Sequence, residues 1–404
     1  MGTGSSGPPQ KRALFYVFDA GTGVGHLRRL SSIARQLQGR FSCLVVTGHR
    51  AAAHWFVPEE CEYVHLPSWD SLLEAKARYW GREPFVAFDK RRAIRLRREI
   101  LRGVVRGFQP DAIFVDHLPL GAEEELSTIL KNTRCRKYFV TRGVLNETED
   151  LRRLILGSKA HHYLMTQYDR IFVAADSKVV DFARQYNLPP ELRAKTLHTG
   201  YVAQGISPEL IARARADRGL GDDDVWVVAS AGGGQMGERL IAGCLELASK
   251  FKNVAFDIVM GPRSKLTWPD PHRTVIVRER LHLHKEAAHM PYLNASADLV
   301  ISSGGYNTLQ EALQGKANIL CFPYRTDLRD EQYQHAVRLQ RFVNLKVSVD
   351  LSELEGLFAR ALRELGRHRR ADRRDELDRA GAANIERIVL ADLGIEPNPT
   401  GARR

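Results

Sequence analysis

The sequence has few cysteines and no long apolar run. Its five cysteines, in 404 residues, are scattered and never form a Cys-x-x-Cys pair, which argues against a zinc knuckle, a redox pair or a disulfide-stapled small domain. No apolar stretch approaches the roughly 20 residues that span a bilayer, and the first residues lack the apolar core of a secretory signal. We therefore expect a cytoplasmic protein with reduced thiols.

Acidic residues are outnumbered by basic ones, 48 against 60, which gives a net charge of +12. Such a charge makes nucleic acid, anionic membranes and phosphorylated ligands candidate partners. Residues 90–106 hold eight of the basic side chains, but the apolar residues among them follow a helical stripe, which is typical of a core-facing helix with a solvated face. Because no nucleic-acid-binding signature is present, we expect no nucleic acid partner and at most peripheral membrane contact.

The order of apolar segments predicts an α/β fold with two domains. Short β-branched runs alternate with amphipathic stretches, which indicates a parallel, doubly wound sheet, and this rhythm starts again at Asp224. We expect a first Rossmann-like domain over residues 11–200, a linker over 201–222, a second such domain over 223–370, and a C-terminal helix over 371–393 that can pack back on the first domain. The predicted strands are 13–18, 42–46, 63–66, 112–115, 137–140, 170–173, 225–230, 254–260, 274–277, 299–302 and 318–322.

A glycine-rich turn follows the first predicted strand of each domain. In the first domain, Gly21, Gly23 and Gly25 lie where backbone N–H groups can face an anion or let a ligand approach closely. The spacing is one residue short of GxGxxG and no acid ends the second strand, so we expect no dinucleotide there. A tight turn that only packs the helix on the strand is the alternative.

The glycine-rich turn of the second domain, residues 232–237, satisfies GxGxxG. No acid ends the strand that follows it, as a dinucleotide site would require, so the pattern predicts a phosphate-binding loop.

The most specific segment surrounds the strand at 299–302. Ser303, Gly304 and Gly305 follow this strand, a helix begins near Tyr306 or Asn307, and Glu311 lies about one turn inside it. Backbone N–H groups at a helix start can bind a diphosphate, and a carboxylate one turn further in can accept hydrogen bonds from both ribose hydroxyls. A solvated surface acid is the alternative interpretation of Glu311.

Together these loops resemble those of the GT-B glycosyltransferases, most closely family 28, the family of the MurG-type N-acetylglucosaminyltransferases. The resemblance covers about residues 13 to 345. It implies two Rossmann-like domains facing a central cleft, with the acceptor in the first and a nucleotide-sugar donor in the second. It also implies an inverting hexosyltransferase (EC 2.4 type) that needs no metal ion or other cofactor and uses a nucleotide-diphosphate sugar, with a UDP-sugar as the expected donor.

The resemblance also implies a donor site. The family's ribose-binding Glu matches Glu311, and its Gln-Gln sugar-binding pair falls on Glu331 and Gln332, where Glu replaces the first Gln and leaves the donor sugar open. The donor-binding residues that we expect are Gly233, Gly234, Gln235, Met236, Arg263, Ser303, Gly304, Gly305, Tyr306, Asn307, Glu311, Glu331 and Gln332.

The loop after the fourth strand departs from the family pattern. Glu123, Glu124 and Glu125 follow that strand, and three acids at the opening of a helix would repel a diphosphate. The acceptor is therefore expected to be a sugar, an aminocyclitol or another small natural product rather than a lipid diphosphate. The loop expected on the acceptor side comprises Gly23, Val24 and Gly25.

Inverting transfer requires a base that takes the proton from the acceptor hydroxyl. His26 closes the first glycine loop, and Asp116 ends the fourth strand on the same edge of the sheet, where it can orient the imidazole. We expect His26 to be the catalytic base and Asp116 its partner. A His26 that only caps the helix is the alternative, and Asp19 and His117 are substitute bases.

Three further interpretations are weighed against this one. His282 with His284, and the pair His161-His162, lack companions at zinc spacing, so no metal site is expected. A sugar-nucleotide epimerase of the same architecture is the alternative function, and it would act without an acceptor. A non-catalytic nucleic-acid binder is the third class.

Overall fold

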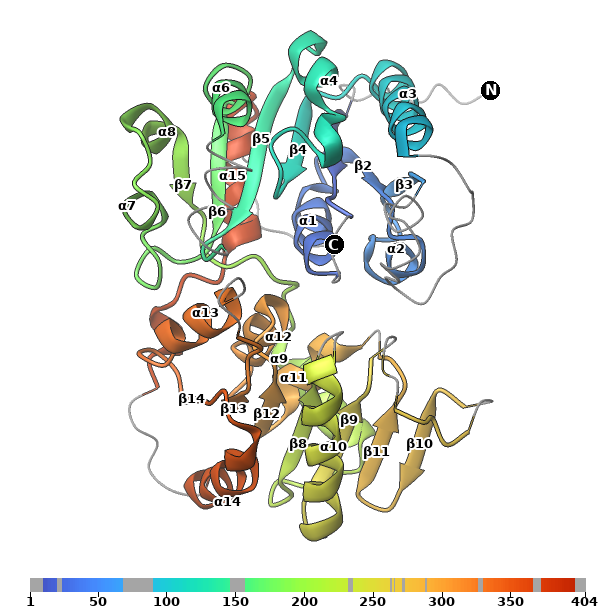
Figure 1. The fold of residues 1–404 in the computed structure, drawn as a ribbon, viewed down its shortest axis with the longest axis vertical. Helices are drawn as coiled ribbons and strands as arrows, with labels where there is room; N and C mark the ends of the chain where they lie inside the picture. The colour runs from blue at the N-terminus through green and yellow to red at the C-terminus, as the bar shows by residue number, and fades with distance from the viewer. Residues whose placement is uncertain are drawn as a thin grey trace.

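The computed structural model describes residues 10–19, 24–67, 90–145, 157–231, 235–261, 264, 266–270, 273–287, 289–325, 330–365 and 372–396. Over these residues the chain forms two seven-stranded sheets, each covered by helices, with the first domain above the second in Figure 1. The chain is therefore α/β, with two doubly wound domains, as its sequence predicts.

The first sheet has the strand order β3-β2-β1-β4-β5-β6-β7, and all of its neighbouring strands are parallel. Strand β4 is buried along its whole length, as expected of a strand covered on both faces. The elements are β1 (Lys11–Tyr16), α1 (Gly25–Leu37), β2 (Phe41–Thr47), α2 (Arg50–Phe56), β3 (Glu62–His65), α3 (Lys90–Phe108), β4 (Ala112–Asp116), η2 (Ala122–Glu124), α4 (Ser127–Asn132), β5 (Arg136–Arg142), α6 (Ser158–Thr166), β6 (Arg170–Ala174), α7 (Phe182–Gln185), α8 (Pro190–Lys195) and β7 (Thr196–His198).

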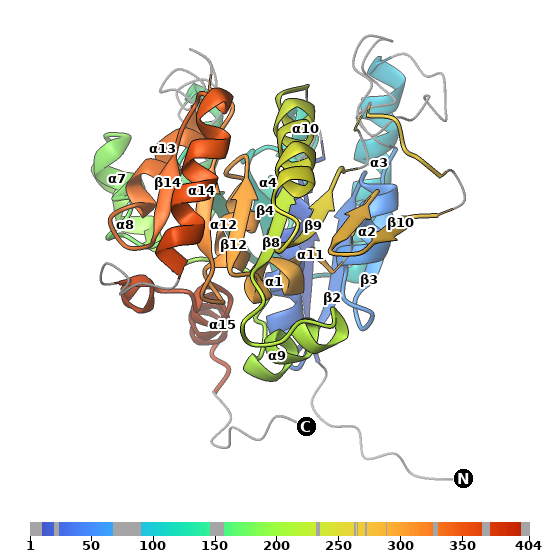
Figure 2. The same ribbon diagram turned by 90° about the horizontal axis from the view of Figure 1, so that it is seen from below.

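The second sheet has the order β10-β11-β9-β8-β12-β13-β14, and only its edge pair β10–β11 is antiparallel. Figure 2 shows α10 and α14 on one face of this sheet and α9 on the other. The elements are α9 (Pro208–Asp217), β8 (Trp226–Ser230), α10 (Gln235–Lys250), β9 (Ala255–Val259), β10 (Val275–Arg278), β11 (Leu281–His284), α11 (Met290–Ser296), β12 (Leu299–Ser302), α12 (Tyr306–Ala312), β13 (Asn318–Cys321), α13 (Glu331–Leu339), β14 (Leu345–Val347), η3 (Leu351–Glu353), α14 (Leu354–Leu365), η4 (Arg374–Glu376) and α15 (Gly381–Asp392).

Every strand predicted from the sequence is present, with ends shifted by a few residues at most. The sequence missed β7, β11 and β14, which are only three or four residues long. Such short strands carry too little apolar periodicity to be detected, and they form because a longer neighbour offers them a partner.

Helix α15 returns to the first domain and packs beside α1 (Figure 1). Its buried Ile385 and Val389 join the core on that face of the first sheet. The side chain of Gln36 on α1 donates to Glu386 at 2.5 Å, and Arg170 of β6 pairs with Asp392 at 2.9 Å. The last helix is therefore part of the structural unit that carries α1.

A buried arginine fixes α3 to the first domain. Arg97 is fully buried, and its guanidinium donates to both carboxylate oxygens of Asp19, at 2.8 and 3.0 Å, and to both of Glu125, at 2.7 Å. The hydroxyl of Tyr16 donates to Glu125 as well, at 2.5 Å. Removing one partner of such a network leaves uncompensated charge in the interior.

None of the helices over the described residues is long and apolar enough to cross a membrane.

Replacing Arg97 by Ala is expected to lower the free energy of unfolding by about 3–5 kcal/mol, because two buried carboxylates lose their cation. Arg95→Ala removes an exposed arginine from the same helix and should change stability by no more than about 0.5 kcal/mol. Urea unfolding of both variants measures the difference. Equal stability of the two variants would show that the network does not hold α3.

Candidate active site

The first turns of α1 and α12 meet between the two sheets. A Cβ atom added to Gly25, the first residue of α1, would lie 3.5 Å from Nδ2 of Asn307 in the first turn of α12. Both helices follow the carboxyl end of a strand, β1 in the first sheet and β12 in the second. In open α/β sheets this edge is where ligands bind.

His26 and Asp116 are in contact, as the sequence predicts. Nδ1 of His26, in the first turn of α1, lies 2.5 Å from Oδ2 of Asp116, the last residue of β4. The carboxylate is fully buried, and its other oxygen, Oδ1, accepts from Nε of Arg29 at 3.0 Å and from Nη2 at 2.5 Å. Asp116 thus binds two residues of α1 at once.

The electrostatics of this group favour a neutral imidazole beside an ionised carboxylate. Burial lowers the pKa of His26, and the opposing effect of the Asp116 charge does not reverse the shift. Burial would raise the pKa of Asp116, but the charge of Arg29 and the contact with His26 outweigh it and hold that pKa well below its usual range. The contact to Asp116 is shorter than the 3.1 Å from Nδ1 to Nη2 of Arg29, so we place the proton of His26 on Nδ1.

With its proton on Nδ1, His26 keeps a lone pair on Nε2. No described residue forms a hydrogen bond with that nitrogen, and the side chain keeps 13% exposure. A positioned carboxylate, a neutral imidazole and a free ring nitrogen are the parts of a general base.

His117 adds a second imidazole next to this pair. Its ring centroid lies 4.7 Å from that of His26, and the ring of Phe18 contacts both at 5.3 and 4.9 Å. Burial holds the pKa of His117 well below its usual range, and the charge of Arg142 adds to the shift. Its Nδ1 is buried without a hydrogen-bond partner among the described residues.

Two expectations about carboxylates in the first domain are wrong. Asp19 is not free to act as a substitute base, because both of its oxygens accept hydrogen bonds from the buried Arg97. The three acids after β4 do not all face a ligand at a helix start, since Glu125 is buried against Arg97 and Glu124 pairs with Lys159. Glu123 and Glu124 lie in the first turn of the short 3-10 helix η2, as expected of acids at the opening of a helix, and α4 begins at Ser127.

The loop between β12 and α12 has the predicted form. Gly304 has a positive φ of 80°, and a Cβ atom there would lie 2.6 Å from Sγ of Cys321, so only glycine fits. Ser303 donates to the carbonyl oxygen of Ala231 at 2.9 Å. Helix α12 begins at Tyr306, and the hydroxyl of Tyr306 donates to the carbonyl of Ala174 at 2.7 Å. Tyr306 thereby joins the second domain to the first.

Glu311 and Glu331 each bind an arginine of the first domain. Glu311 is only 2% exposed, so its interpretation as a surface acid is wrong. One of its oxygens pairs with Arg28 of α1, and the other accepts from Nδ2 of Asn294 at 2.8 Å.

Glu331 is the counterpart on α13. Nη1 of Arg142, at the end of β5, donates to Oε1 of Glu331 at 2.8 Å, and Nη2 lies 2.6 Å from Oε2. Gln332 follows Glu331 and is partly buried. Two ion pairs therefore cross between the domains at acids that the sequence assigns to the donor.

Several expected site residues lie outside the described part of the chain. These are Gly23 of the first glycine loop and Gly233, Gly234 and Arg263 of the second domain; Gln235 and Met236 are described as the first residues of α10 without their side chains. Val24 directly precedes α1, and Gly25 is its first residue.

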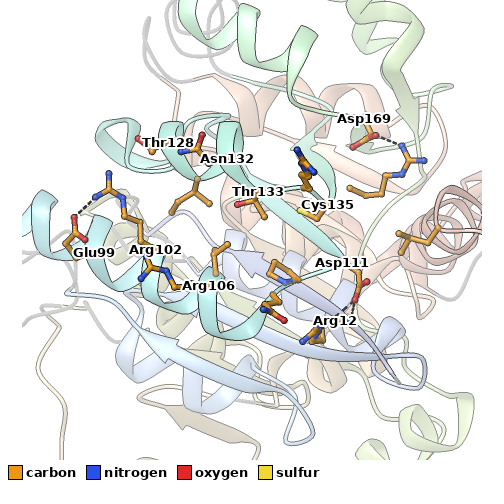
Figure 3. Close-up of a pocket in the computed structure, with 17 residues that line it drawn as sticks. Arg12, Glu99, Arg102, Arg106, Asp111, Thr128, Asn132, Thr133, Cys135 and Asp169 are labelled. Carbon is orange, nitrogen blue, oxygen red and sulfur yellow. Dashed lines mark hydrogen bonds and ion pairs between the residues drawn. The ribbon is translucent and has the colours of Figure 1, made fainter. Parts of the chain in front are cut away.

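A cavity of about 1190 Å³ lies at the other edge of the first sheet (Figure 3). Its lining includes Arg12, Asp111, Arg136 and Asp169, which lie at or near the amino ends of strands. It is therefore separate from the group formed by His26 and Asp116.

Comparison with known proteins gives a family match in the second domain. Residues 271–386 match the model of the glycosyltransferase family 28 C-terminal domain. No curated protein matches the chain in sequence.

Solved structures match nearly the whole chain. The glycotransferase of kitacinnamycin has a TM-score of 0.62 and 13% identity, over 96% of this chain and 100% of its own. The calicheamicin glycosyltransferase has a TM-score of 0.60 and 16% identity, over 96% and 99%. The spinosyn rhamnosyltransferase complexed with thymidine diphosphate has a TM-score of 0.54 and 14% identity, over 94% and 95%. The likeness establishes the GT-B fold.

The imidazole of His26 is expected to titrate below its ordinary pKa of about 6.5. Because the Asp116 carboxylate favours the charged imidazole, Asp116→Asn should lower the pKa of His26 further. The C2 proton of labelled histidine, assigned by its loss in His26→Gln, reports both values in an NMR titration. A pKa of His26 above 6.5 would contradict the neutral imidazole.

Proposed function

We propose that this chain, a glycosyltransferase with the GT-B fold and a family 28 C-terminal domain, performs inverting, metal-independent transfer of a sugar from a nucleoside diphosphate to a hydroxyl of a small molecule. The observation that carries this proposal is the contact between His26 and Asp116 at the edge of the first sheet. The same helix turn lies against α12, where the donor is expected.

The reaction is a single displacement at the anomeric carbon of the sugar. The acceptor oxygen forms the new bond to this carbon as its proton passes to Nε2 of His26, and the bond to the diphosphate oxygen breaks. Asp116, ionised and in contact with Nδ1, stabilises the imidazolium that results. Attack on the face opposite the leaving group inverts the configuration.

The leaving diphosphate needs positive charge, and arginines of the first domain supply it in our proposal. Arg28 and Arg142 lie at the boundary between the domains, where each pairs with an acid of the second. Ribose hydroxyls would take the place of Arg28 at Glu311 and free its guanidinium for the diphosphate. In this proposal Glu311 binds either Arg28 or the ribose and Glu331 binds Arg142, so the two acids form a poor site for a catalytic divalent ion.

The similar solved structures suggest the class of acceptor and the nucleobase of the donor. The solved relatives include glycosyltransferases of calicheamicin and spinosyn, and one of them is complexed with thymidine diphosphate. We therefore propose a natural-product or other small hydroxyl acceptor, and thymidine diphosphate sugars should be tested beside the UDP-sugars that the sequence favours.

His26→Ala should lower turnover by about 10²- to 10⁴-fold while nucleotide affinity stays nearly unchanged, because the base acts only in proton transfer. His162→Ala, an exposed histidine on α6, is the matched control and should retain full turnover.

The wild-type enzyme should lose turnover as the pH drops through the lowered pKa of His26, because the protonated imidazole cannot accept the acceptor's proton. Its turnover should persist in EDTA, because no metal ion takes part in the proposed reaction. Near-normal turnover in His26→Ala would remove this residue as the base, and sugar conversion without an acceptor would favour the epimerase.

Glu311→Ala should weaken nucleoside diphosphate binding by about 30- to 150-fold, the equivalent of roughly 2–3 kcal/mol for two lost hydrogen bonds to a carboxylate. Glu246→Ala, an exposed acid on α10, should bind as the wild type does. Calorimetric titration with UDP and thymidine diphosphate gives these affinities. Wild-type affinity in Glu311→Ala would place the ribose elsewhere.

A further inference from the structure

Three side chains on the sheet of the second domain lie together, away from the residues assigned to sugar transfer. Asp257 is on β9, and His282 and His284 are on the neighbouring β11, with His282 directly opposite Asp257 in the register. Two histidines separated by one residue project from the same face of a strand. The expectation that these histidines lack a companion is therefore wrong, because the companion comes from another strand.

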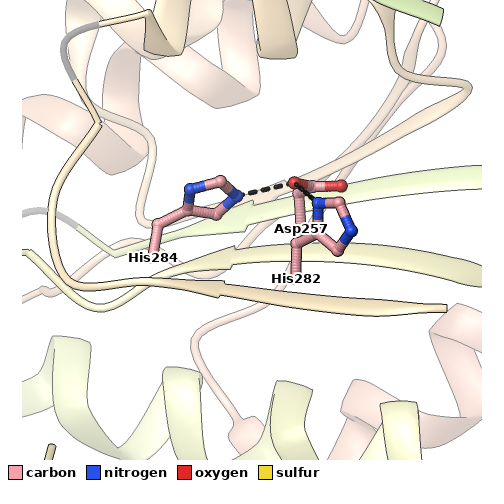
Figure 4. Close-up of side chains that lie close together, drawn as sticks. All are labelled: Asp257, His282 and His284. Carbon is pink, nitrogen blue, oxygen red and sulfur yellow. Dashed lines mark hydrogen bonds and ion pairs between the residues drawn. The ribbon is translucent and has the colours of Figure 1, made fainter. Parts of the chain in front are cut away.

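The donor atoms of this group converge (Figure 4). Nε2 of His284 lies 2.6 Å from Oδ1 of Asp257, and Nδ1 of His282 lies 3.6 Å from the same oxygen. One ligand atom from each residue lies within 4.8 Å of the other two. Ligand atoms on a tetrahedral zinc ion are roughly 3.3 Å apart. The distance from His282 to Asp257 is close to this spacing, whereas His284 lies closer to Asp257 and must move away from it to share an ion.

The orientation of the carboxylate is set by two other residues. Oδ2 of Asp257 accepts from Nε of Arg218 at 2.7 Å and from Nε1 of Trp226 at 2.8 Å. This leaves Oδ1 directed at the two imidazoles. Donors that hold the outer oxygen of a ligating carboxylate are a common feature of metal sites, because they fix the ligand before the ion arrives.

A cavity gives water access to these three side chains, and another histidine lies nearby. A cavity of about 420 Å³ reaches it between α9, α11 and the sheet, and its lining includes His282, His284, His289 and Asp217. His284 is 4% exposed, and its Nδ1 has no hydrogen-bond partner among the described residues. The ring of His289 lies 5.7 Å from that of His284. A water molecule from the cavity can complete a set of four ligands.

We propose that Asp257, His282 and His284 form a binding site for one zinc ion. Two imidazoles and one carboxylate suit zinc and similar transition metals, whereas magnesium and calcium prefer oxygen ligands. The ion ties the edge hairpin β10–β11 to β9, and its role is structural rather than catalytic.

The test uses the full chain, purified without a histidine tag, stripped with EDTA and desalted. Zinc titration by calorimetry should give one site per chain, and zinc should raise the melting temperature. Cobalt should give visible absorption bands at the same stoichiometry. Absence of a stoichiometric site in the wild type would overturn the proposal and leave a structural hydrogen-bond network.

Variants of the partly exposed His282 distinguish a loss of zinc binding from a loss of folding. His282→Ala should weaken zinc binding by at least about 10-fold, and His282→Cys should retain the site because a thiolate also binds zinc. His162→Ala is the control and should bind zinc as the wild type does. Unchanged affinity in His282→Ala, with circular dichroism showing a folded chain, would refute the site. Zinc binding is read without any nucleotide or acceptor, so this outcome is independent of the proposed transfer.

Discussion

The contacts of the buried Asp116 carboxylate determine how the residues at the carboxyl edge of the first sheet are arranged. It ends β4 and binds two residues of one helix turn, His26 and Arg29, so that the start of α1 is fixed against the sheet. The same contact sets which ring nitrogen of His26 carries the proton. The hydrogen bond between His26 and Asp116 thus fixes both the position and the protonation of the proposed base. This bond is strong because its acceptor is a buried, ionised carboxylate.

The boundary between the domains is bridged by two acids that we also propose as ligands of the donor. Glu311 and Glu331 neutralise Arg28 and Arg142 across this boundary. A buried carboxylate without a cation or a hydroxyl partner is unfavourable, so the contact with Arg28 stabilises the buried Glu311. In the proposed reaction, ribose hydroxyls would replace Arg28 at Glu311, so that a donor would bind without leaving this carboxylate unpaired.

Part of the excess of basic over acidic residues is explained by contacts inside the protein. The buried Arg29 and Arg97 and the largely covered Arg218 each pair with a buried carboxylate, in three separate places. A planar guanidinium with several donors can satisfy both oxygens of an acid or two acids at once, which lysine cannot do. These arginines therefore indicate how the interior is neutralised, and they say little about external partners.

The sequence by itself determined the α/β order of elements and the turn at Gly304, because local periodicity and strand ends depend on neighbouring residues. It also predicted the pairing of His26 with Asp116, 90 positions apart, because each follows or ends a predicted parallel strand and such strand ends share one edge of a sheet. It could not determine the partners of Asp19, Glu125 and Glu311, since these arginines lie 78, 28 and 283 positions away along the chain. It also missed the approach of Asp257 to His284, because spacing along one strand does not include the strand beside it. Only the tertiary structure brings such distant charges together, and burial then forces them to pair.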